Sequence, residues 1–469
     1  MRRAVAAALC AATTLAASAA SASVFEMFGA GPRAVGMAGA MTAAASGGEA
    51  AFHNPAMLAG SVLAGAWGGF DMTHYDLTIS LARPVCTDAT ATCRSAFPGG
   101  FSSRAAQLPR DTSGVQLGWH YPLGGIFKER VVLGAGLALP NGHLIRISGP
   151  DPQTPHFPMY EGMPDRIAFL FAAAWRVTDN FWIGAGVQVL AGLDANIQLA
   201  LNPTNGTMDS ASIRIGLQPK ARLTAGTAVH APHDLWFGAS FRQRLSLEYQ
   251  IPTDVALGKP ADLAIQLRHE TLFTPDSFHG GIAWRPAHGP VLVSADLTWS
   301  LWSAMPDPSP QVALDVGGTA VNGMGLGTAL DVGTNTPAIK LGYHDTLSPA
   351  LAAEWTITEN WRLRSGYQYR PTPAPRATGP FDYLDGDAHA LGLGVGFAFG
   401  QHDEAALAKL AARDDDPAGP QPKLHVDLGS QVLILPRRTV YKSDPGDPVG
   451  NLEHGGAVWN VSLAFGGAF

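Results

Sequence analysis

The segment Trp361–Arg370, WRLRSGYQYR, decides the fold class, because its side chains alternate between two chemical kinds. One face of an extended strand would carry Trp361, Leu363, Tyr367 and Tyr369, and the other would carry Arg362, Arg364, Gly366, Gln368 and Arg370. A period of two indicates a β-strand. Aromatic residues at both ends of the apolar face, opposite a face of charged residues and glycine, are typical of a strand that separates lipid from a polar lumen.

The same alternation recurs along the chain, in the segments 181–189, 212–225, 291–301, 424–434 and 459–469. Each segment has about the length of a tilted strand that spans a bilayer. After residue 22, no stretch approaches the roughly 18 apolar residues that a transmembrane helix needs. These segments predict an all-β protein, and specifically a transmembrane antiparallel β-barrel.

The connections between these segments alternate between short and long. The short turns are 178–180, 232–234, 287–289 and 358–360, and the long, Pro- and Gly-rich stretches include 142–164, 303–337 and 371–388. Short periplasmic turns and long outer loops are a feature of bacterial outer-membrane barrels. We count about 14 strands in residues 61–469. The charged segment 401–422 breaks the rule, and we interpret it as a periplasmic insertion that is either merely solvated or a docking site.

Two further segments precede the barrel. Residues 1–22 combine Arg2 and Arg3, an apolar run and a small-residue cleavage site, which predicts a signal peptide. Residues 23–60 are rich in Gly and Ala and end in the turn Asn54, Pro55 and Ala56. A small-residue segment ahead of a barrel predicts a plug, or hatch, inside the lumen.

Other functional classes lack their motifs. The formal net charge of −7 argues against a nucleic-acid partner. No nucleophile elbow, zinc pair or dinucleotide fingerprint is present, so we expect neither an enzyme nor a cofactor; His425 and Ser430 cannot be paired from sequence alone. Cys86 and Cys93 predict a disulfide that closes a loop, with metal binding as the alternative.

In their order, these segments resemble the FadL/TodX family of outer-membrane transporters for long-chain fatty acids and other hydrophobic compounds. The resemblance rests on residues 29–60 with the Asn54 turn, on 294–303, on 361–369 and on YLDGDAH at 383–389. It implies a fourteen-stranded barrel with a hatch, in the outer membrane of a Gram-negative bacterium. It also implies that substrate leaves sideways through the wall beside a kinked third strand, here residues 130–141.

Gly134, Gly136 and Pro140 in that strand are residues that interrupt a β-ladder. They either create the opening in the wall or leave room for the hatch. The sequence departs from the family at residues 201–212, which are short and polar where relatives often carry a helical insertion. The entrance is therefore expected at the loops 84–112 and 142–164, with Phe157, Met159 and Tyr160.

Two sets of residues are candidates for ligand binding. The arginines expected to face the lumen either hold a substrate carboxylate or pair with acids such as Glu49, Asp194, Asp296 and Asp427; they include Arg214, Arg222, Arg362 and Arg364. Phe25, Met27 and Phe28 either line the high-affinity site, as the resemblance implies, or pack the hatch.

The sequence thus predicts passive, hatch-gated transport of hydrophobic molecules, such as long-chain fatty acids or alkyl and aromatic hydrocarbons, by lateral diffusion through the barrel wall. The alternative is a general diffusion porin for small hydrophilic solutes. The expected partners are the hydrophobic substrate, outer-membrane lipid and the barrel assembly machinery, for which the terminal Phe469 would be the signal. No metal is expected, and we expect a monomer.

Overall fold

The computed structural model describes residues 25–81, 106–128, 130–141, 154–161, 167–202, 207–256, 262–286, 289–306, 311–317, 341–379, 381–399, 424–443, 447 and 449–468. The predicted signal peptide, the Cys86–Cys93 disulfide, the 401–422 insertion and the assembly signal at Phe469 lie outside these residues. In the part of the chain that is described, no helix is both long and apolar enough to cross a membrane.

The described strands form a closed antiparallel barrel of fourteen strands, as predicted, in which β1 pairs with both β2 and β17. Eleven of these strands are continuous: β1 (Gly65–Leu81), β2 (Thr112–Pro122), β3 (Val131–Pro140), β4 (Ala168–Arg176), β5 (Phe181–Asn202), β6 (Thr207–Ala231), β13 (Thr346–Thr356), β14 (Trp361–Arg370), β15 (Ala388–Phe399), β16 (Leu424–Val440) and β17 (Leu452–Ala468). The other three each consist of two collinear pieces: β7 (Leu235–Arg242) with β8 (Leu245–Ala256), β9 (Asp262–Thr274) with β10 (Ser277–Trp284), and β11 (Val291–Ser300) with β12 (Gln311–Gly317).

The alternation along β14 confirms the orientation predicted for this strand. Trp361, Leu363 and Tyr367 are exposed on the outside, whereas Arg364 between them is buried. Aromatic rings also form a row across neighbouring strands on the outer face, where Phe278 lies 5.0 Å from Phe241 and 5.6 Å from Trp299 between ring centroids. An outward-facing apolar band bounded by aromatic rings is stable in lipid and would be unfavourable in water.

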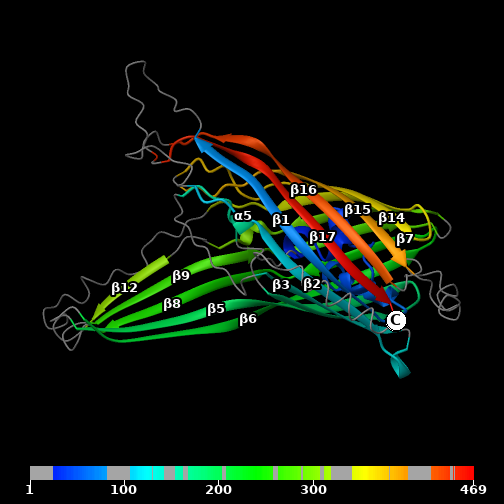
Figure 1. The fold of residues 1–469 in the computed structure, drawn as a ribbon, viewed down its shortest axis with the longest axis horizontal. Helices are drawn as coiled ribbons and strands as arrows, with labels where there is room; N and C mark the ends of the chain where they lie inside the picture. The colour runs from blue at the N-terminus through cyan, green and yellow to red at the C-terminus, as the bar shows by residue number, and fades with distance from the viewer. Residues whose placement is uncertain are drawn as a thin grey trace, which may run out of the picture.

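The two ends of the barrel differ (Figure 1). Short turns connect β4 to β5, β6 to β7 and β13 to β14 at the end where β17 finishes. At the opposite end, β5, β6, β8, β9 and β12 continue past the rim as a projecting arm. Within the arm, Ile197–Ala200 of β5 pairs in parallel with Thr253–Ala256 of β8.

The arm corrects the prediction of a polar loop at residues 201–212. Residues 201–202 belong to β5 and residues 207–212 belong to β6, so that only residues 203–206 separate the two strands. The two strands pair along most of their lengths. This ladder, which shifts register once between Ala200 and Leu201, satisfies the backbone hydrogen-bonding groups that a loop would have to satisfy with side chains or water.

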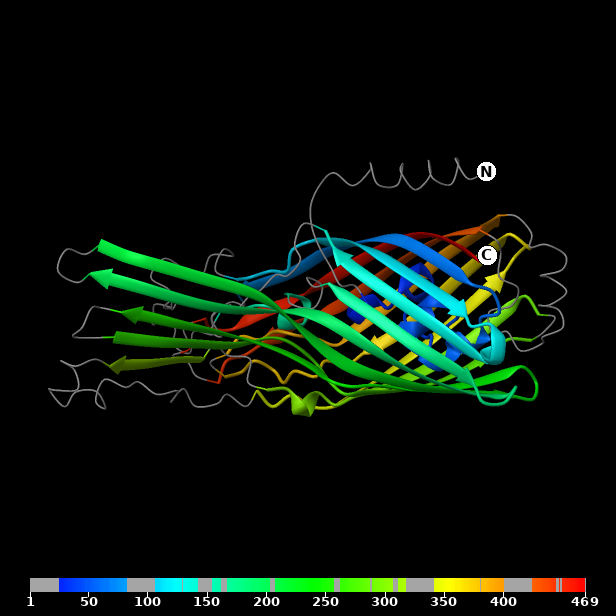
Figure 2. The ribbon, with the colours of Figure 1, turned by 90° about the horizontal axis from the view of Figure 1, so that it is seen from below.

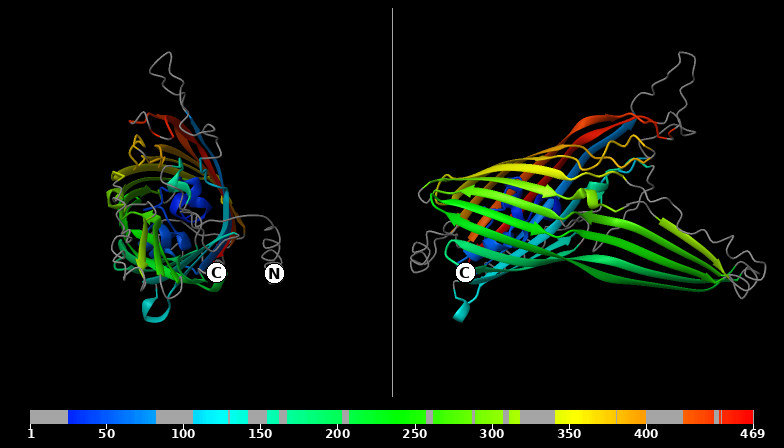
Figure 3. Two further views of the ribbon diagram at one scale, coloured as in Figure 1. Left: turned by 90° about the vertical axis from the view of Figure 1, so that its left-hand side faces the viewer. Right: turned by 180° about the vertical axis from the view of Figure 1, so that it is seen from behind.

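The hatch consists of five short helical pieces inside the lumen: α2 (Phe25–Phe28), α3 (Gly31–Gly36), η1 (Gly47–Glu49), α4 (Ala50–His53) and η2 (Pro55–Gly60). It fills the half of the barrel near the short turns (Figures 2 and 3). Its small side chains pack into a buried cluster with wall residues such as Trp182 and Trp236. β1 begins at Gly65, shortly after the last of these pieces.

Glycines on the inner face of the wall allow the hatch backbone to approach closely. A Cβ atom at Gly392 of β15 would lie 2.6 Å from the Val35 carbonyl oxygen. At Gly184, Gly226, Gly366 and Gly429, an added Cβ would overlap backbone or side-chain atoms of the hatch. The fit between hatch and wall therefore depends on glycine on several strands.

Candidate functional site: a lumenal cavity bounded by the hatch

A cavity of about 210 Å³ lies between the hatch and the end of the barrel with the long connections; we call it the outer cavity. The hatch contributes Phe25, Met27, Phe28 and Phe52 to its lining, and the short helix α5 (Pro158–Glu161) contributes Met159 and Tyr160. Trp302, in the turn η4 (Trp302–Ala304), lines it from the wall. Several of these residues continue into a buried apolar cluster that reaches Phe157 and Leu384.

Aromatic contacts join the hatch to this lining. The rings of Phe25 and Phe52 are 5.4 Å apart between centroids. Tyr75 of β1 lies 6.4 Å from Tyr160, and its hydroxyl donates to the sulfur of Met27 at 3.6 Å. The outer cavity is therefore amphipathic: the aromatic and apolar residues of the hatch, α5 and η4 form one part of its lining, and hydroxyl, amide and charged side chains of the hatch and the wall form the rest. Apolar surface with placed polar groups is the composition of a pocket that binds an apolar ligand and orients it.

A cluster of charged and polar side chains lies where α2 of the hatch meets the wall. Arg222 of β6 is 1% exposed, and its guanidinium donates to Glu26 of α2, to Gln188 of β5 at 2.8 Å and to Thr274 of β9 at 2.9 Å. Gln188 in turn donates to Glu26 at 2.9 Å. Burial alone would raise the pKa of Glu26, but Arg222 and Arg242 outweigh it and hold this pKa below its usual range.

Arg242 of β7 is the second cation at this junction. Its Nη2 donates to the Phe52 carbonyl oxygen at 2.8 Å, and its guanidinium lies 3.9 Å from the centre of the Phe52 ring. Its Nε is buried and has no hydrogen-bond partner among the described residues. Two guanidinium groups and one carboxylate therefore meet at the inner end of the outer cavity.

The turn Asn54, Pro55 and Ala56 anchors the other end of the hatch. The Asn54 side chain is fully buried, and its Nδ2 donates to the carbonyl oxygens of Thr42 at 2.9 Å and Thr227 at 3.0 Å. Its Oδ1 accepts from the Ala56 amide at 3.1 Å and caps η2. One side chain thus joins two parts of the hatch to β6.

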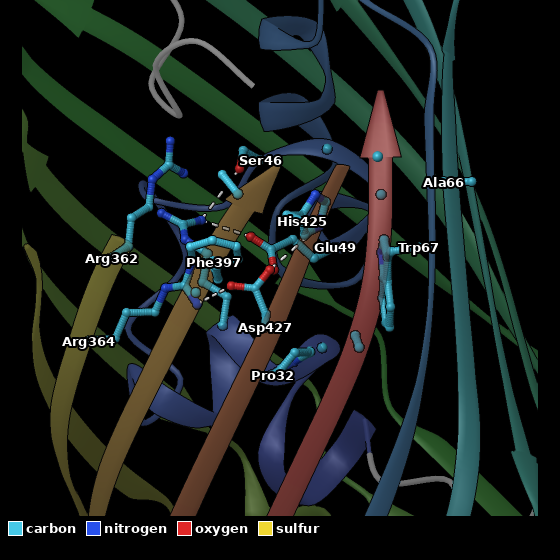
Figure 4. A pocket seen from close by; sticks show the side chains of 18 of the residues that line it. Pro32, Ser46, Glu49, Ala66, Trp67, Arg362, Arg364, Phe397, His425 and Asp427 are labelled. Atoms are coloured by element: carbon cyan, nitrogen blue, oxygen red, sulfur yellow. Dashed lines mark hydrogen bonds and ion pairs between the residues drawn. The ribbon is translucent and has the colours of Figure 1, made fainter. Parts of the chain in front are cut away.

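A buried ionic network holds α3 on the side of the short turns, around a second cavity of about 110 Å³ that we call the inner cavity (Figure 4). Arg33 donates at 2.8 Å to both Glu49 of the hatch and Glu354 of β13. Arg364 of β14 donates to the same Glu354 at 2.7 Å and also pairs with Asp427 of β16. Buried charges of this kind must be paired, and removing one partner is strongly destabilising.

The structure separates the predicted ligand-binding residues into three groups. Phe25, Met27, Phe28 and Arg222 line the outer cavity. Arg362 and Arg364 line the inner cavity instead, on the far side of the hatch. Arg364 is ion-paired there with Glu354 and Asp427 of the wall. Arg214 is exposed on the arm portion of β6 and lines neither cavity.

The third strand is more regular than expected. β3 pairs with β2 from Val132 to Pro140 without a change in register, so the ladder between these two strands is not interrupted at Gly134 or Gly136. Gly134 makes room for the hatch, since an added Cβ would lie 2.9 Å from the methyl carbons of Leu58. Gly136 instead lies against Leu170 of β4. On the other side of β3, the pairing with β4 among the described residues ends at Ala138, two residues before Pro140.

Sequence reasoning missed Glu26, Arg33 and Glu354, which contribute most of the charged contacts between hatch and wall. Arg33 is the only lysine or arginine in the hatch segment 29–60, and a buried cation in a small-residue plug requires an acidic partner. The need of Arg33 for an acidic partner could therefore have been inferred from the sequence. Its partner Glu354 was not identifiable from sequence, because 321 positions separate the two residues.

Comparisons with known proteins agree with this architecture. Residues 165–415 match the family described as outer membrane protein transport protein (OMPP1/FadL/TodX). The chain is 21% identical over 234 residues to the alkane uptake protein A of Marinobacter nauticus, a match that covers 45% of this chain and only about half, 47%, of that protein.

Solved structures resemble the whole barrel. A FadL homologue from Pseudomonas aeruginosa has a TM-score of 0.57 at 16% identity, covering 94% of this chain and 98% of that one. The P. putida toluene transporter TodX has a TM-score of 0.53 at 15% identity, covering 94% and 99%. At these identities the likeness establishes the fold. Since the family match extends over more than half of the sequence, this chain belongs to the OMPP1/FadL/TodX family and is a β-barrel of the Gram-negative outer membrane.

Proposed function

We propose that this protein carries hydrophobic molecules across the outer membrane by passive diffusion, with the hatch as the gate. The observation that carries the proposal is the outer cavity, in which Phe25, Phe52, Tyr160 and Trp302 form an apolar part of an otherwise largely polar lining and the hatch closes one side. An apolar ligand that moves from water into such a cavity gains roughly 25 cal/mol for each Å² of apolar surface buried.

The hatch also argues against a general diffusion porin. It contacts strands around the barrel, from β1 to β6 and from β14 to β17. A porin depends on a continuous water-filled passage, and in this barrel the ionic network of Arg33 and the Asn54 turn hold a plug across that passage. Movement of the hatch is therefore the step that would permit transport.

We further propose that the ligand leaves sideways, beside β3. Support comes from the early end of the β3–β4 ladder at Ala138 and from the contact of Gly134 with Leu58 in the hatch, which would couple hatch movement to this part of the wall. The related proteins named for alkane uptake and toluene transport act on hydrophobic compounds, which is consistent with this class of substrate. We also infer a monomer, inserted by the barrel assembly machinery through β17.

Uptake by a deletion strain tests the proposal. Cells that lack the gene should take up dodecane, toluene or dodecanoic acid more slowly than cells that carry it, whereas uptake of a disaccharide should not change. Unchanged uptake of all three hydrophobic probes would exclude the function. Faster disaccharide uptake together with steady single-channel conductance would identify a porin instead.

A disulfide staple tests the lateral exit. Leu139 and Ile167 are the next opposed positions beyond the last β3–β4 pair, Ala138 and Ala168. The double substitution Leu139→Cys and Ile167→Cys should slow hydrophobic uptake under oxidising conditions, and a reductant should restore it. The pair Leu363→Cys and Val395→Cys, at opposed positions of β14 and β15, is the matched control. Equal rates in oxidised and reduced staple cells would rule out an exit at this position.

A further inference from the structure

The first turn of the hatch, α2, is attached differently from the rest of the hatch. Gly29 and Gly31 have φ angles of +87° and +82°, a conformation that glycine adopts without strain. They flank Ala30, whose amide donates to His53 at 3.2 Å, and join α2 to α3. The main body of the hatch is held by the Asn54 turn and the Arg33 network, so α2 can move while that body stays in place.

Among the charged residues of the hatch, Glu26 alone belongs to α2, and it is the charged link between α2 and the wall. Its carboxylate pairs with Arg222 and accepts from Gln188 at 2.9 Å, and its side chain is 7% exposed. The other three side chains of α2, Phe25, Met27 and Phe28, are apolar and at most 7% exposed, and they pack in the buried cluster that borders the outer cavity. Detaching α2 therefore requires that Glu26 separate from Arg222 and that the apolar contacts of these side chains be replaced, which the alkyl chain of a ligand in the cavity can do.

Separation of this pair is unfavourable unless another anion replaces Glu26. Without Glu26, the neighbouring guanidinium groups of Arg222 and Arg242 would be buried with no carboxylate between them. The same geometry suits the carboxylate of a ligand, because guanidinium groups bind carboxylates through paired hydrogen bonds. The buried Nε of Arg242 has no hydrogen-bond partner among the described residues and could donate to it. The remaining charged residues in the cavity lining, Arg370 and Asp385, are of opposite sign.

We propose that the Glu26 carboxylate occupies the position of a ligand carboxylate, so that an acidic amphiphile exchanges with Glu26 and releases α2, whereas an uncharged hydrophobic molecule binds without the exchange. Glu26 is then a specificity-determining residue, and ligand charge decides whether the first turn of the hatch moves. The inference rests on the proposed function, since it concerns the same cavity.

The substitution Glu26→Gln tests the exchange. The glutamine keeps the oxygen that accepts from Gln188 but no longer competes as an anion. Binding of dodecanoate and of its methyl ester is measured by calorimetry at pH 8 in one detergent. We expect the dissociation constant for dodecanoate to fall at least tenfold in the variant, and that for the ester to change less than twofold. Glu49→Gln, which removes a hatch carboxylate on the opposite side of the hatch, is the comparison for general loosening.

An equal change for both probes, or the same dodecanoate effect in Glu49→Gln, would overturn the inference. A second readout needs no variant: dodecanoate should increase amide hydrogen exchange of residues 25–28 in the natural protein, and the ester should not. Equal exchange with both probes would contradict the proposal while ester binding still supported the proposed function. If neither probe bound the natural protein, both would fail.

Discussion

At the scale of single residues, Asn54 joins more partners than any neighbour in its turn. Its side chain is fully buried and makes hydrogen bonds to Thr42, Ala56 and Thr227. A truncated side chain would leave these backbone groups without a partner in a place that water does not reach. Such a loss would weaken the attachment of the hatch to β6 and leave the strand pairing of the barrel intact.

The substitution Asn54→Ala should destabilise the seated hatch by roughly 3 kcal/mol or more, given about 1–3 kcal/mol for each of the three buried groups left unsatisfied. The expected result is a barrel that folds normally and conducts ions more often in planar bilayers. Asn360→Ala is the matched control, because Asn360 makes its hydrogen bond to Ala398 in an exposed turn. Identical conductance in Asn54→Ala and the natural protein would mean that the turn does not hold the hatch.

His53 makes the hatch sensitive to acid. Burial and, after it, Arg242 lower the pKa of His53 from 6.5 to about 3, so the folded hatch holds the neutral ring that accepts from the Ala30 amide. A group whose pKa is lowered on folding contributes stability that is complete above its unfolded pKa and is lost as the pH falls. The loss from His53 begins near pH 6.5 and amounts to at most about 1.4 kcal/mol for each pH unit.

Conductance of the natural protein should therefore rise as the pH is lowered from 7 to 5. Glu26, whose pKa is also lowered, contributes with the same sign only below its usual value of 4.5. His53→Gln keeps an acceptor for Ala30 and cannot titrate, so its conductance should stay flat over this range. The same increase in conductance at low pH in His53→Gln and in the natural protein would show that His53 does not cause the acid response.

At the scale of the elements, the hatch and the wall fit together through glycine. Gly280 and Gly281 of β10 are adjacent residues with different surroundings: an added Cβ at Gly281 would lie 2.8 Å from the Thr42 Cβ and closer still to Asp296, while one at Gly280 would meet nothing within 4 Å. Asp296 accepts from the Thr42 amide at 2.7 Å, so this wall position is also a hatch contact.

Gly281→Ala should weaken the seated hatch by roughly 1–3 kcal/mol, the usual cost of inserting an extra carbon into a tightly packed interface. Gly280→Ala should leave the hatch unchanged. Limited proteolysis of the hatch in purified protein distinguishes them, with faster cleavage expected only for Gly281→Ala. Similar cleavage of the two variants would mean that the interface tolerates added volume and that close packing does not hold the hatch.

At the scale of the whole molecule, local sequence patterns predicted much of the fold, because side chains along a barrel strand face lipid and lumen alternately. β14 illustrates this: Trp361 and Leu363 are exposed to the outside and Arg364 is buried, as its alternation predicts. The site was only partly predictable. Arg222 and Arg364 both belong to the inner face, but the hatch places them in different cavities, and the pairing of Arg33 with Glu354 depends on residues that are far apart in sequence.

The arm and the third strand show the same limit. The polar composition of residues 201–212 predicts a loop, yet most of these residues belong to the paired strands β5 and β6. Gly134 and Gly136 are compatible with a kinked strand or with close packing, and only the position of Leu58 shows that Gly134 accommodates the hatch. Composition alone does not distinguish a loop from a strand, or a kink from close packing, because each depends on which segment of the chain packs against these residues.

The central claim is that hydrophobic molecules occupy the outer cavity, and photolabelling with an alkyl diazirine tests it most directly. The purified protein is labelled and the modified residues are identified by mass spectrometry. We predict labels on the cavity residues Phe25, Phe52, Tyr160 and Trp302, which an excess of unlabelled dodecane removes. Labels confined to lipid-facing residues such as Trp299 and Trp361, unaffected by dodecane, would contradict the account.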